Sequence, residues 1–546
     1  MLDIWYKNAV IYCLDVETFM DSNGDGIGDF RGLADRLDYI EALGATCVWL
    51  LPFYPTPNRD NGYDVSDFYA VDPRLGTLGD FVAFTHAAHD RGLRVIIDLV
   101  ANHTSIDHPW FQAARSDPNS PYRNWYVWSK EKPENIHEGV IFPGVQDATW
   151  TYDEVAGAWY MHRFYQHQAD LNIVNPEVKA ELEKIMGFWL QLGVSGFRLD
   201  AVPFLIEYRG VPEEQQPKGD PHHYLTEIRD FLSWRRAEAM MLAEANITMD
   251  QVDEYFGPNG DRMHVIFNFM LNQHFYLAMA RGDAEPMRRV MADTPAIPPK
   301  AQWASFLRNH DELDLGCLTD DERQEAFAAF GPQPDMQIYE RGIRRRLAPM
   351  LEGDERRLKL AFSLMFAWPG TPVLWYGDEI GMGDDLTQPE RNSVRTPMQW
   401  SDEANAGFSD APADRLVRPV VAKGEFDYRR VNVAAQHDLP GSLMDDLQRV
   451  VRVRRSCPEV GWGEMQVLET GETSVLALRC DWEGDTVVTL HNLADRSVEV
   501  TLRLDGLQRL RPLFCNRGDR DVREAGAPIQ LDPYGFRWFR GHCERR

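Results

Sequence analysis

Three short segments of this 546-residue chain carry side chains that could do chemistry together. The segments are Gly196–Asp200, Leu242–Asn246 and Leu307–Asp311, and their reactive side chains are Arg198, Asp200, Glu244, His310 and Asp311. Each segment ends an apolar, strand-like run with charged or polar residues. In a barrel of parallel strands such strand ends meet on one face, where active sites lie. Three carboxylates and an arginine gathered there suit the cleavage or transfer of a glycosidic bond.

Asp200 and Glu244 form the candidate catalytic pair. A retaining glycosidase needs a carboxylate nucleophile and a second carboxyl group that alternates between acid and base. Arg198 lies two positions before Asp200, so both side chains project from one face of a strand. A guanidinium there favours the ionised form of the nucleophile. A single acidic residue at a strand end is more often a helix cap, but the three segments together favour catalysis.

Other polar side chains could bind a sugar. His103 and His310 lie in polar strand-end segments and can donate hydrogen bonds to sugar hydroxyls. Tyr63 could stack on a sugar face. Its neighbour Asp64 could pair with a second arginine, for which Arg395 is the candidate.

The elements that must position these residues are short apolar runs separated by helical segments. The runs are Val10–Leu14, Thr46–Leu51, Val95–Val100, Gly196–Leu199, Met240–Leu242, Val265–Phe267, Trp303–Leu307 and Pro372–Tyr376. Each run alone could be a buried helix turn, but their repetition predicts an α/β fold, a (β/α)8 TIM barrel. A helix is predicted after Asn175, which is a good N-cap followed by Pro176.

The pattern of residues along the chain also predicts how it divides into domains. Residues 1–102 and 175–460 are predicted to form the barrel, and residues 103–174 an inserted subdomain. Residues 311–353 would be a second, lid-like insertion. Alternating short strands in residues 461–546 predict a C-terminal all-β sandwich domain.

Charge and cysteine content limit the partners. The formal net charge is −28, from 57 basic and 85 acidic residues, which disfavours nucleic acid and anionic membranes as partners. The sequence shows no secretory signal and no run long enough to cross a bilayer. The seven cysteines are odd in number and scattered, so we expect a reduced, cytoplasmic protein without disulfides. Homo-oligomer formation is left open.

The segment Asp21–Asp29 places oxygen ligands at alternate positions, which suits Ca²⁺. The predicted ligands are Asp21, Asn23, Asp25, the carbonyl of Ile27, and Asp29. The pattern is like the start of an EF-hand loop, but Gly32 stands where that loop has its bidentate glutamate. An Asx-rich turn without metal is the alternative.

These residues resemble the α-amylase superfamily of glycoside hydrolases. The matching segments are Asp98–His103, Gly196–Asp200, Glu244 and Asn309–Asp311, and the resemblance covers essentially the whole chain. It implies Asp200 as nucleophile, Glu244 as acid/base and Asp311 as transition-state stabiliser. It also implies that the sugar is held by Tyr63, Asp64, His103, Gln168, Arg198, His310 and Arg395. A second Ca²⁺ near Asn102, Asp170 and Glu207 is a further implication, and no organic cofactor is expected.

Within this superfamily the chain is most similar to the enzymes that interconvert maltose and trehalose. The supporting stretches are Tyr6–Tyr12, Gly196–Pro203, Leu307–Leu313, Arg344–Met350 and Tyr376–Gly383. The segment Glu207–His222 departs from that pattern, as do Cys13 and Gln166. After Asp200 the chain has Ala201 rather than a valine, and in this it resembles relatives that prefer α-1,4 links over α-1,6 links.

Two alternatives to isomerisation remain. One is an α-glucosidase that hydrolyses maltose or short malto-oligosaccharides, with transglycosylation. The other is a catalytically inactive sugar-binding scaffold, which the three carboxylates disfavour. Isomerisation requires a pocket that closes over both sugars, and we expect Ala101–Asp170 and Asp311–Gly353 to supply the cover.

Overall fold

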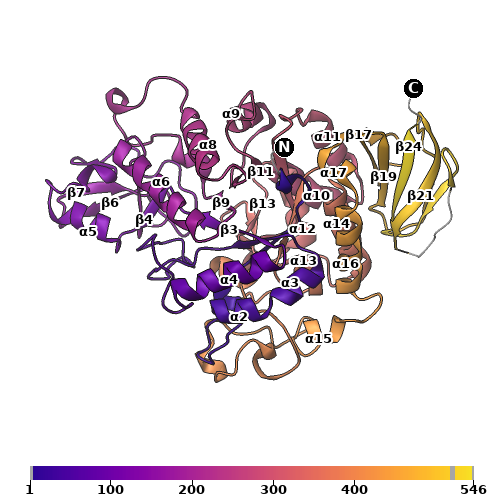
Figure 1. The fold of residues 1–546 in the computed structure, drawn as a ribbon, viewed down its shortest axis with the longest axis horizontal. Coiled ribbons are helices and arrows are strands. Elements are labelled where there is room, and N and C mark those ends of the chain that lie inside the picture. The colour runs from indigo at the N-terminus through magenta and orange to yellow at the C-terminus, as the bar shows by residue number, and fades with distance from the viewer. Residues whose placement is uncertain (1–3, 517–522, 544–546) are drawn as a thin grey trace.

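The computed structural model describes residues 4–516 and 523–543. Eight parallel strands of the described chain close into a barrel in the order β1-β16-β12-β11-β10-β9-β3-β2 (Figure 1). They are β1 (Ile11–Leu14), β2 (Cys47–Leu50), β3 (Arg94–Leu99), β9 (Gly196–Leu199), β10 (Met240–Ala243), β11 (Val265–Phe267), β12 (Gln302–Phe306) and β16 (Thr371–Trp375). Every strand falls within one or two residues of a predicted run, so the predicted barrel is confirmed.

Helices surround the barrel and bury their apolar faces against it. They include α1 (Val16–Phe19), α2 (Phe30–Asp35), α3 (Leu37–Leu43), α4 (Leu78–Asp90), α6 (Pro176–Gln191), α7 (Val202–Leu205), α8 (His223–Arg235), α9 (Val252–Phe256), α10 (Phe269–Arg281), α11 (Glu285–Asp293), α14 (Glu355–Ala367), α15 (Val433–Gln436), α16 (Leu443–Arg455) and α17 (Pro458–Trp462). Helix α6 begins as predicted, because Asn175 Oδ1 accepts a hydrogen bond from the Glu177 N–H at 2.9 Å.

The chain between β3 and α6 forms a subdomain beside the barrel, seen in purple at the left of Figure 1. Its elements are β4 (His103–Ser105), α5 (Pro109–Ser116), β5 (Trp128–Ser129), β6 (Trp150–Asp153), β7 (Ala158–Met161) and β8 (Gln168–Asp170). Strands β4 and β8 pair antiparallel, and β5, β7 and β6 make a small sheet. The subdomain has its own apolar cluster around Val127, Trp150 and Met161.

A second insertion follows β12. It contains β13 (Leu313–Asp314), α12 (Asp320–Phe330), β14 (Gln337–Ile338), β15 (Gly342–Ile343) and α13 (Leu347–Met350). Strand β15 lies between β13 and β14 in a small antiparallel sheet. Arg341, just before β15, donates a 3.0 Å hydrogen bond to the carbonyl of Ile141 in the subdomain. The inserted subdomain and this second insertion therefore contact each other directly.

The C-terminal part is all β. Its strands are β17 (Glu464–Leu468), β18 (Val475–Trp482), β19 (Asp485–Asn492), β20 (Val498–Val500), β21 (Leu507–Cys515), β22 (Arg523–Glu524), β23 (Ile529–Leu531) and β24 (Phe536–Cys543). In the described chain β17, β18, β19, β24, β21 and β22 form one sheet, and β20 pairs with β23. An apolar core that includes Val488, Leu502 and Phe539 holds these strands together.

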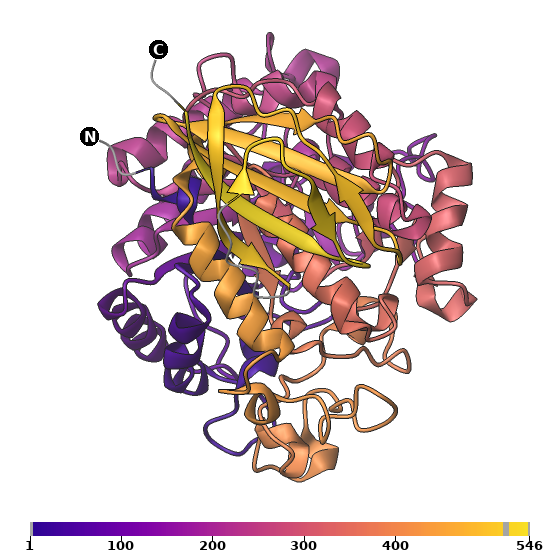
Figure 2. The same cartoon turned by 90° about the vertical axis from the view of Figure 1, so that its right-hand side faces the viewer.

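The C-terminal domain lies far from the inserted subdomain, at the right of Figure 1, and Figure 2 shows its yellow sheet facing the viewer. It joins the barrel through α14, where Ser363 Oγ is 2.9 Å from both His491 Nε2 and Trp538 Nε1. Six cysteines are free thiols in the structure: Cys13, Cys47, Cys317, Cys457, Cys480 and Cys515. In the part of the chain that the structure describes, no helix has the length and apolar character that spanning a bilayer requires.

Candidate active site

Strands β9 and β10 bring the candidate catalytic residues together. Arg198 lies in β9 opposite Leu242 of β10 on one side and Asp98 of β3 on the other. The strands approach closely at Gly196, where an added Cβ would lie 2.2 Å from the carbonyl oxygen of Met240. A glycine is therefore required there, and the close pairing sets the register that presents Asp200 and Glu244 side by side.

One guanidinium connects the carboxylates. Arg198 Nη1 lies 2.6 Å from Asp98 Oδ1 and also contacts Asp200 Oδ1. Arg198 Nη2 lies 2.8 Å from Glu244 Oε2. Arg198 is buried, so its charge is little screened by solvent. The predicted pairing of Arg198 with Asp200 is present, and it extends to the acid/base and to Asp98.

The pKa values of Asp200 and Glu244 suit a nucleophile and an acid/base, respectively. Burial raises the pKa of Asp200 to about 6, although Arg198 opposes the shift, so this carboxylate is ionised at neutral pH and can act as nucleophile. Burial raises the pKa of Glu244 to about 7, against the attraction of Arg198 and with the repulsion of Asp200 and Asp311. Glu244 can therefore both give and take a proton near neutrality.

The turn after the nucleophile also positions the acid/base. Ala201 has φ 52° and ψ 41°, the left-handed region that residues other than glycine rarely occupy. In this conformation its N–H donates a 3.1 Å hydrogen bond to Glu244 Oε2. Backbone strain held next to reacting groups is typical of active sites.

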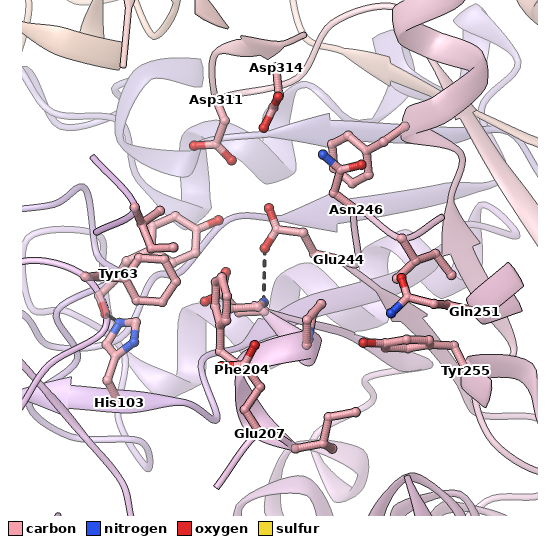
Figure 3. A pocket seen from close by; sticks show the side chains of 18 of the residues that line it. Tyr63, His103, Phe204, Glu207, Glu244, Asn246, Gln251, Tyr255, Asp311 and Asp314 are labelled. Carbon is pink, nitrogen blue, oxygen red and sulfur yellow. Dashed lines mark hydrogen bonds between the residues drawn. The ribbon is translucent and has the colours of Figure 1, made fainter. Parts of the chain in front are cut away.

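Asp311 lines the same cavity and lies across from Glu244 in Figure 3. Asp311 Oδ1 lies 2.8 Å from Arg391 Nη1 and 3.0 Å from Arg395 Nη2, and Asp311 Oδ2 lies 2.9 Å from His310 Nε2. Burial alone would raise the pKa of Asp311, but His310, Arg391 and Arg395 hold it well below its usual range. A permanently negative carboxylate here can stabilise a positively charged sugar transition state.

Tyr63, His103 and His310 form one polar cluster. The Tyr63 hydroxyl lies 2.7 Å from His310 Nε2, and the two rings stack with centroids 5.6 Å apart. His103 Nε2 lies 3.1 Å from the Tyr63 carbonyl oxygen. Burial lowers the pKa of both histidines to about 4, so both are neutral at physiological pH.

The predicted sugar-binding residues separate into two groups. Tyr63, His103 and Gln168 line the cavity. Arg198, His310 and Arg395 are buried behind it and act on Asp200, Glu244 and Asp311. In the structure these three side chains contact the catalytic carboxylates, and their contact with a sugar stays a prediction.

The predicted pair of Asp64 and Arg395 is wrong. Asp64 accepts hydrogen bonds from the Arg59 and Asp60 N–H groups and from Thr56 Oγ1, and so holds its own turn. The pair that forms is Asp60 with Arg391, 2.9 Å between Oδ1 and Nη2. Gln168 Nε2 donates to Asp60 Oδ2 at 2.9 Å, which ties the inserted subdomain to this pair.

The predicted Ca²⁺ loop is rich in oxygen donors, but each acidic side chain already serves the loop. Asp21 Oδ1 accepts the N–H groups of Asn23 and Gly24, Asp25 Oδ1 accepts that of Ile27, and Asp29 Oδ1 caps α2 at Gly32. An all-oxygen donor set fits Ca²⁺. No group of three or more histidine, cysteine, aspartate or glutamate side chains among the described residues has a metal-holding arrangement. The ion stays a prediction.

At the second predicted ion site an arginine supplies the positive charge. Arg163 pairs with Glu207, and its backbone N–H donates to Asp170 Oδ1 at 2.8 Å. Asn102 Nδ2 donates to the same Asp170 oxygen at 3.3 Å. The second ion stays a prediction as well, and Arg163 already fills its electrostatic role.

The cavity has a volume of about 860 Å³, toward the upper end of the range for small-molecule sites. Sequence reasoning missed several of its lining residues, which are Asp60, Phe142, Asn246, Gln251, Tyr255 and Arg391. They lie on loops and a short helix. The unusual segment Glu207–His222 contributes to the same wall, but none of these six residues lies in it.

Loops from three parts of the chain meet at the rim of the cavity. Glu390 accepts hydrogen bonds from the hydroxyls of Tyr165, in the subdomain, and Tyr339, in the second insertion, the latter at 2.7 Å. The Phe142 ring packs on both tyrosines, with centroids 4.7 Å apart in each case. We call Phe142, Tyr165, Tyr339 and Glu390 the rim clamp. Both insertions thus contribute residues to this rim, and closure over two sugars stays a prediction.

Two family models match the chain. The family model described as "Alpha amylase, catalytic domain" matches residues 13–330 and 343–463. A second model, "Sucrose hydrolase-like, C-terminal domain", matches residues 484–540.

Named relatives match over the whole chain. "Trehalose synthase/amylase TreS" of Mycobacterium tuberculosis is 43% identical, covering 98% of this chain and 90% of the relative. "Trehalose synthase" of Thermus thermophilus is 44% identical over 98% of this chain and 55% of the relative. An isomaltulose synthase from Erwinia rhapontici, solved with sucrose, superposes with a TM-score of 0.80 at 25% identity, covering 98% and 99% of the two chains.

Proposed function

The chain belongs to the α-amylase family, and on that premise we propose that it is a retaining α-glucosyl enzyme that interconverts maltose and trehalose. The proteins named trehalose synthase are 41–45% identical to it over 98% of its length. The oligo-1,6-glucosidases are more distant, at 27–28% identity. The similarity therefore favours isomerisation over simple hydrolysis.

The first half of the reaction breaks the α-1,4 bond. Asp200 attacks the anomeric carbon while Glu244 gives its proton to the glycosidic oxygen, so glucose leaves and a glucosyl ester of Asp200 forms. Asp311, ionised on the opposite wall, stabilises the positive charge that develops on the sugar ring. Arg198 contacts both reacting carboxylates and keeps them aligned.

The second half forms trehalose. The released glucose turns within the cavity and presents its anomeric hydroxyl to the glucosyl ester. Glu244, now deprotonated, takes the proton of that hydroxyl as the new bond forms and Asp200 is released. Because water can attack the same intermediate, the outcome depends on keeping water out of the cavity and glucose in it.

The observation that carries isomerisation over hydrolysis is the rim clamp. Tyr165 and Tyr339 come from separate insertions and share the Glu390 carboxylate, and Phe142 fills the space between them. Arg391, next to Glu390, binds Asp60 and Asp311 at the catalytic centre. Closure of the rim is thus linked to the group that stabilises the transition state.

The second candidate is an α-glucosidase acting on maltose or short malto-oligosaccharides, with transglycosylation. The volume of the cavity and the similarity to oligo-1,6-glucosidases favour it. An inactive scaffold does not fit, because all three carboxylates face one cavity with pKa values suited to catalysis. Calcium binding, a cytoplasmic location and self-association stay predictions from the sequence.

Incubation with maltose tests the proposal. We expect trehalose to accumulate, with free glucose as a minor product, when the sugars are separated by chromatography. Glucose without trehalose at every maltose concentration would refute isomerisation and leave the α-glucosidase.

A further inference from the structure

Arg418 is a buried arginine that the chemistry proposed above does not use. It lies in the long loop between β16 and α15, is 6% exposed, and is not among the described residues that line the cavity. Its Nη1 donates a hydrogen bond to the carbonyl oxygen of Arg395 at 3.2 Å, and its Nη2 donates to Asn61 Oδ1 at 2.6 Å. The planar guanidinium therefore fixes how far apart these two segments lie.

Arg395 and Asn61 belong to two arms that meet again at Asp311. On one arm, Arg395 Nη2 lies 3.0 Å from Asp311 Oδ1. On the other arm, Asp60 is the neighbour of Asn61, and its Oδ1 lies 2.9 Å from Arg391 Nη2. Arg391 Nη1 lies 2.8 Å from the same Asp311 oxygen. The contacts therefore close into a ring, which we call the Asp311 ring: Asp311, Arg395, Arg418, Asn61, Asp60 and Arg391.

The Asp311 ring limits where the Asp311 carboxylate can lie. Arg391 and Arg395 bind the same carboxylate oxygen, so a shift of either backbone would move the negative charge. Asn61 has φ 47°, in the left-handed region, and the bond from Arg418 to its side chain holds this turn in place. A displacement of about 1 Å at a reacting centre can lower a rate about a hundredfold, so this restraint matters for catalysis.

Two carboxylates neutralise the buried charge of Arg418. Glu17 Oε1 lies 2.9 Å from Arg418 Nη2, and Asp15 Oδ2 lies 3.7 Å from Arg418 Nη1. Both acids follow β1 directly, and Asp15 caps α1 by accepting the Glu17 N–H at 3.0 Å. The other Glu17 oxygen binds Arg74 Nη1 at 2.8 Å, outside the ring. Because an unpaired buried charge is costly, these acids hold the guanidinium in one place.

The backbone that carries Arg418 is docked on the Asp21–Asp29 loop. The Val417 N–H donates a hydrogen bond to the carbonyl oxygen of Gly26 at 2.9 Å. Gly26 has φ 98°, and an added Cβ there would lie 2.2 Å from the carbonyl oxygen of Arg415. This close approach requires glycine, and it fixes the chain just before Arg418.

We propose that Arg418 is a positioning residue for the reaction: by closing the Asp311 ring it holds the Asp311 carboxylate where positive charge develops on the sugar. Arg418 acts through Arg395 and Asn61. The proposal rests on the retaining chemistry proposed above, in which Asp311 stabilises the transition state, but not on whether glucose or water accepts the glucosyl group.

The test replaces Arg418 by leucine and probes the transition state separately from the substrate. In Arg418→Leu we expect kcat for total maltose consumption to fall about tenfold with KM within twofold of wild type, because Asp311 acts mainly on the transition state. Deoxynojirimycin, a glucose analogue with a protonated ring nitrogen, probes the same charge at equilibrium. Its Kd, measured by calorimetry, should rise about tenfold, while the Kd of neutral glucose should stay within twofold.

Two further variants make the test specific. Arg74→Leu removes an arginine from the same Glu17 carboxylate without touching the Asp311 ring, so it is the matched control and should leave kcat and both Kd values unchanged. Asn61→Gly removes the amide from the ring and still permits the left-handed turn. It should raise the Kd of deoxynojirimycin about fivefold, and it tests the ring even if Arg418→Leu does not fold.

Two results would overturn the proposal. One is a kcat and a deoxynojirimycin Kd within twofold of wild type in folded Arg418→Leu or, if that variant does not fold, in Asn61→Gly. The other is a loss of affinity for glucose as large as that for deoxynojirimycin, which would indicate general damage to the cavity. A wild type that consumes no maltose would refute the proposed function instead, and the equilibrium binding of the two ligands would still test the ring.

Discussion

At the scale of single residues, the chemistry depends on Arg198, which contacts Asp98, Asp200 and Glu244 together. Asp200→Asn keeps the shape of the side chain but removes the nucleophile. We expect turnover of maltose to fall by about 10⁴-fold or more. The melting temperature should hold or rise slightly, because one of three crowded carboxylates loses its charge. Residual activity above about one hundredth of wild type would contradict this assignment.

The pH dependence of kcat/KM belongs to the same residues. Below about pH 6 Asp200 gains a proton and loses its nucleophilicity, and above about pH 7 Glu244 loses the proton that the leaving group needs. The coupled pair should therefore give a narrow bell with apparent pKa values near 6 and 7. A profile measured on maltose that stays flat on the alkaline side up to about pH 9 would show that Glu244 is not the acid.

At the scale of elements, the rim clamp should control the fate of the glucosyl intermediate. The double variant Tyr165→Phe, Tyr339→Phe removes both hydrogen bonds to Glu390 but keeps the packing on Phe142. We expect the ratio of glucose to trehalose formed from maltose to rise several-fold, since water enters more readily. Tyr152→Phe removes a tyrosine hydroxyl from the exposed face of the subdomain, so it serves as the control and should leave the product ratio unchanged. An unchanged product ratio in a variant with normal turnover would mean that the rim does not exclude water.

The loop Asp21–Asp29 gives a separate test at this scale. If it binds Ca²⁺, removing the ion with a chelator should lower the melting temperature by a few degrees, and added Ca²⁺ should restore it. In Asp25→Ala, which loses the hydrogen bond to the Ile27 N–H, the chelator should have no further effect. If the wild type contains no metal by elemental analysis and its melting temperature ignores the chelator, the loop is an Asx-rich turn.

For the whole molecule, the sequence predicted what depends on short-range pattern. The barrel strands are short apolar runs, many of them rich in β-branched or aromatic residues. The residues that directly follow such strands, for example Asp200 after β9 and Glu244 after β10, must lie on one face of the barrel. Helix α6 was predictable from its N-cap Asn175. These features need no knowledge of loop geometry.

The features that the sequence did not predict depend on how loops fold in three dimensions. Asp60 and Asp64 are equally plausible partners for an arginine, as are Arg391 and Arg395, and only the turn that buries Asp64 decides between them. Tyr255 lies on a short helix whose burial against the 204–222 segment has no periodic signal. The rim clamp joins residues from three distant loops, which no local pattern can align.

The most direct test of the central claim, transfer of glucose within one closed pocket, follows an isotope. Maltose is incubated with the protein in the presence of excess ¹³C-labelled glucose, and the trehalose formed is analysed by mass spectrometry. Trehalose should accumulate and be largely unlabelled, because the released glucose turns and reacts before it can exchange. Trehalose labelled in proportion to the free glucose, or glucose with no trehalose at all, would contradict transfer within the pocket.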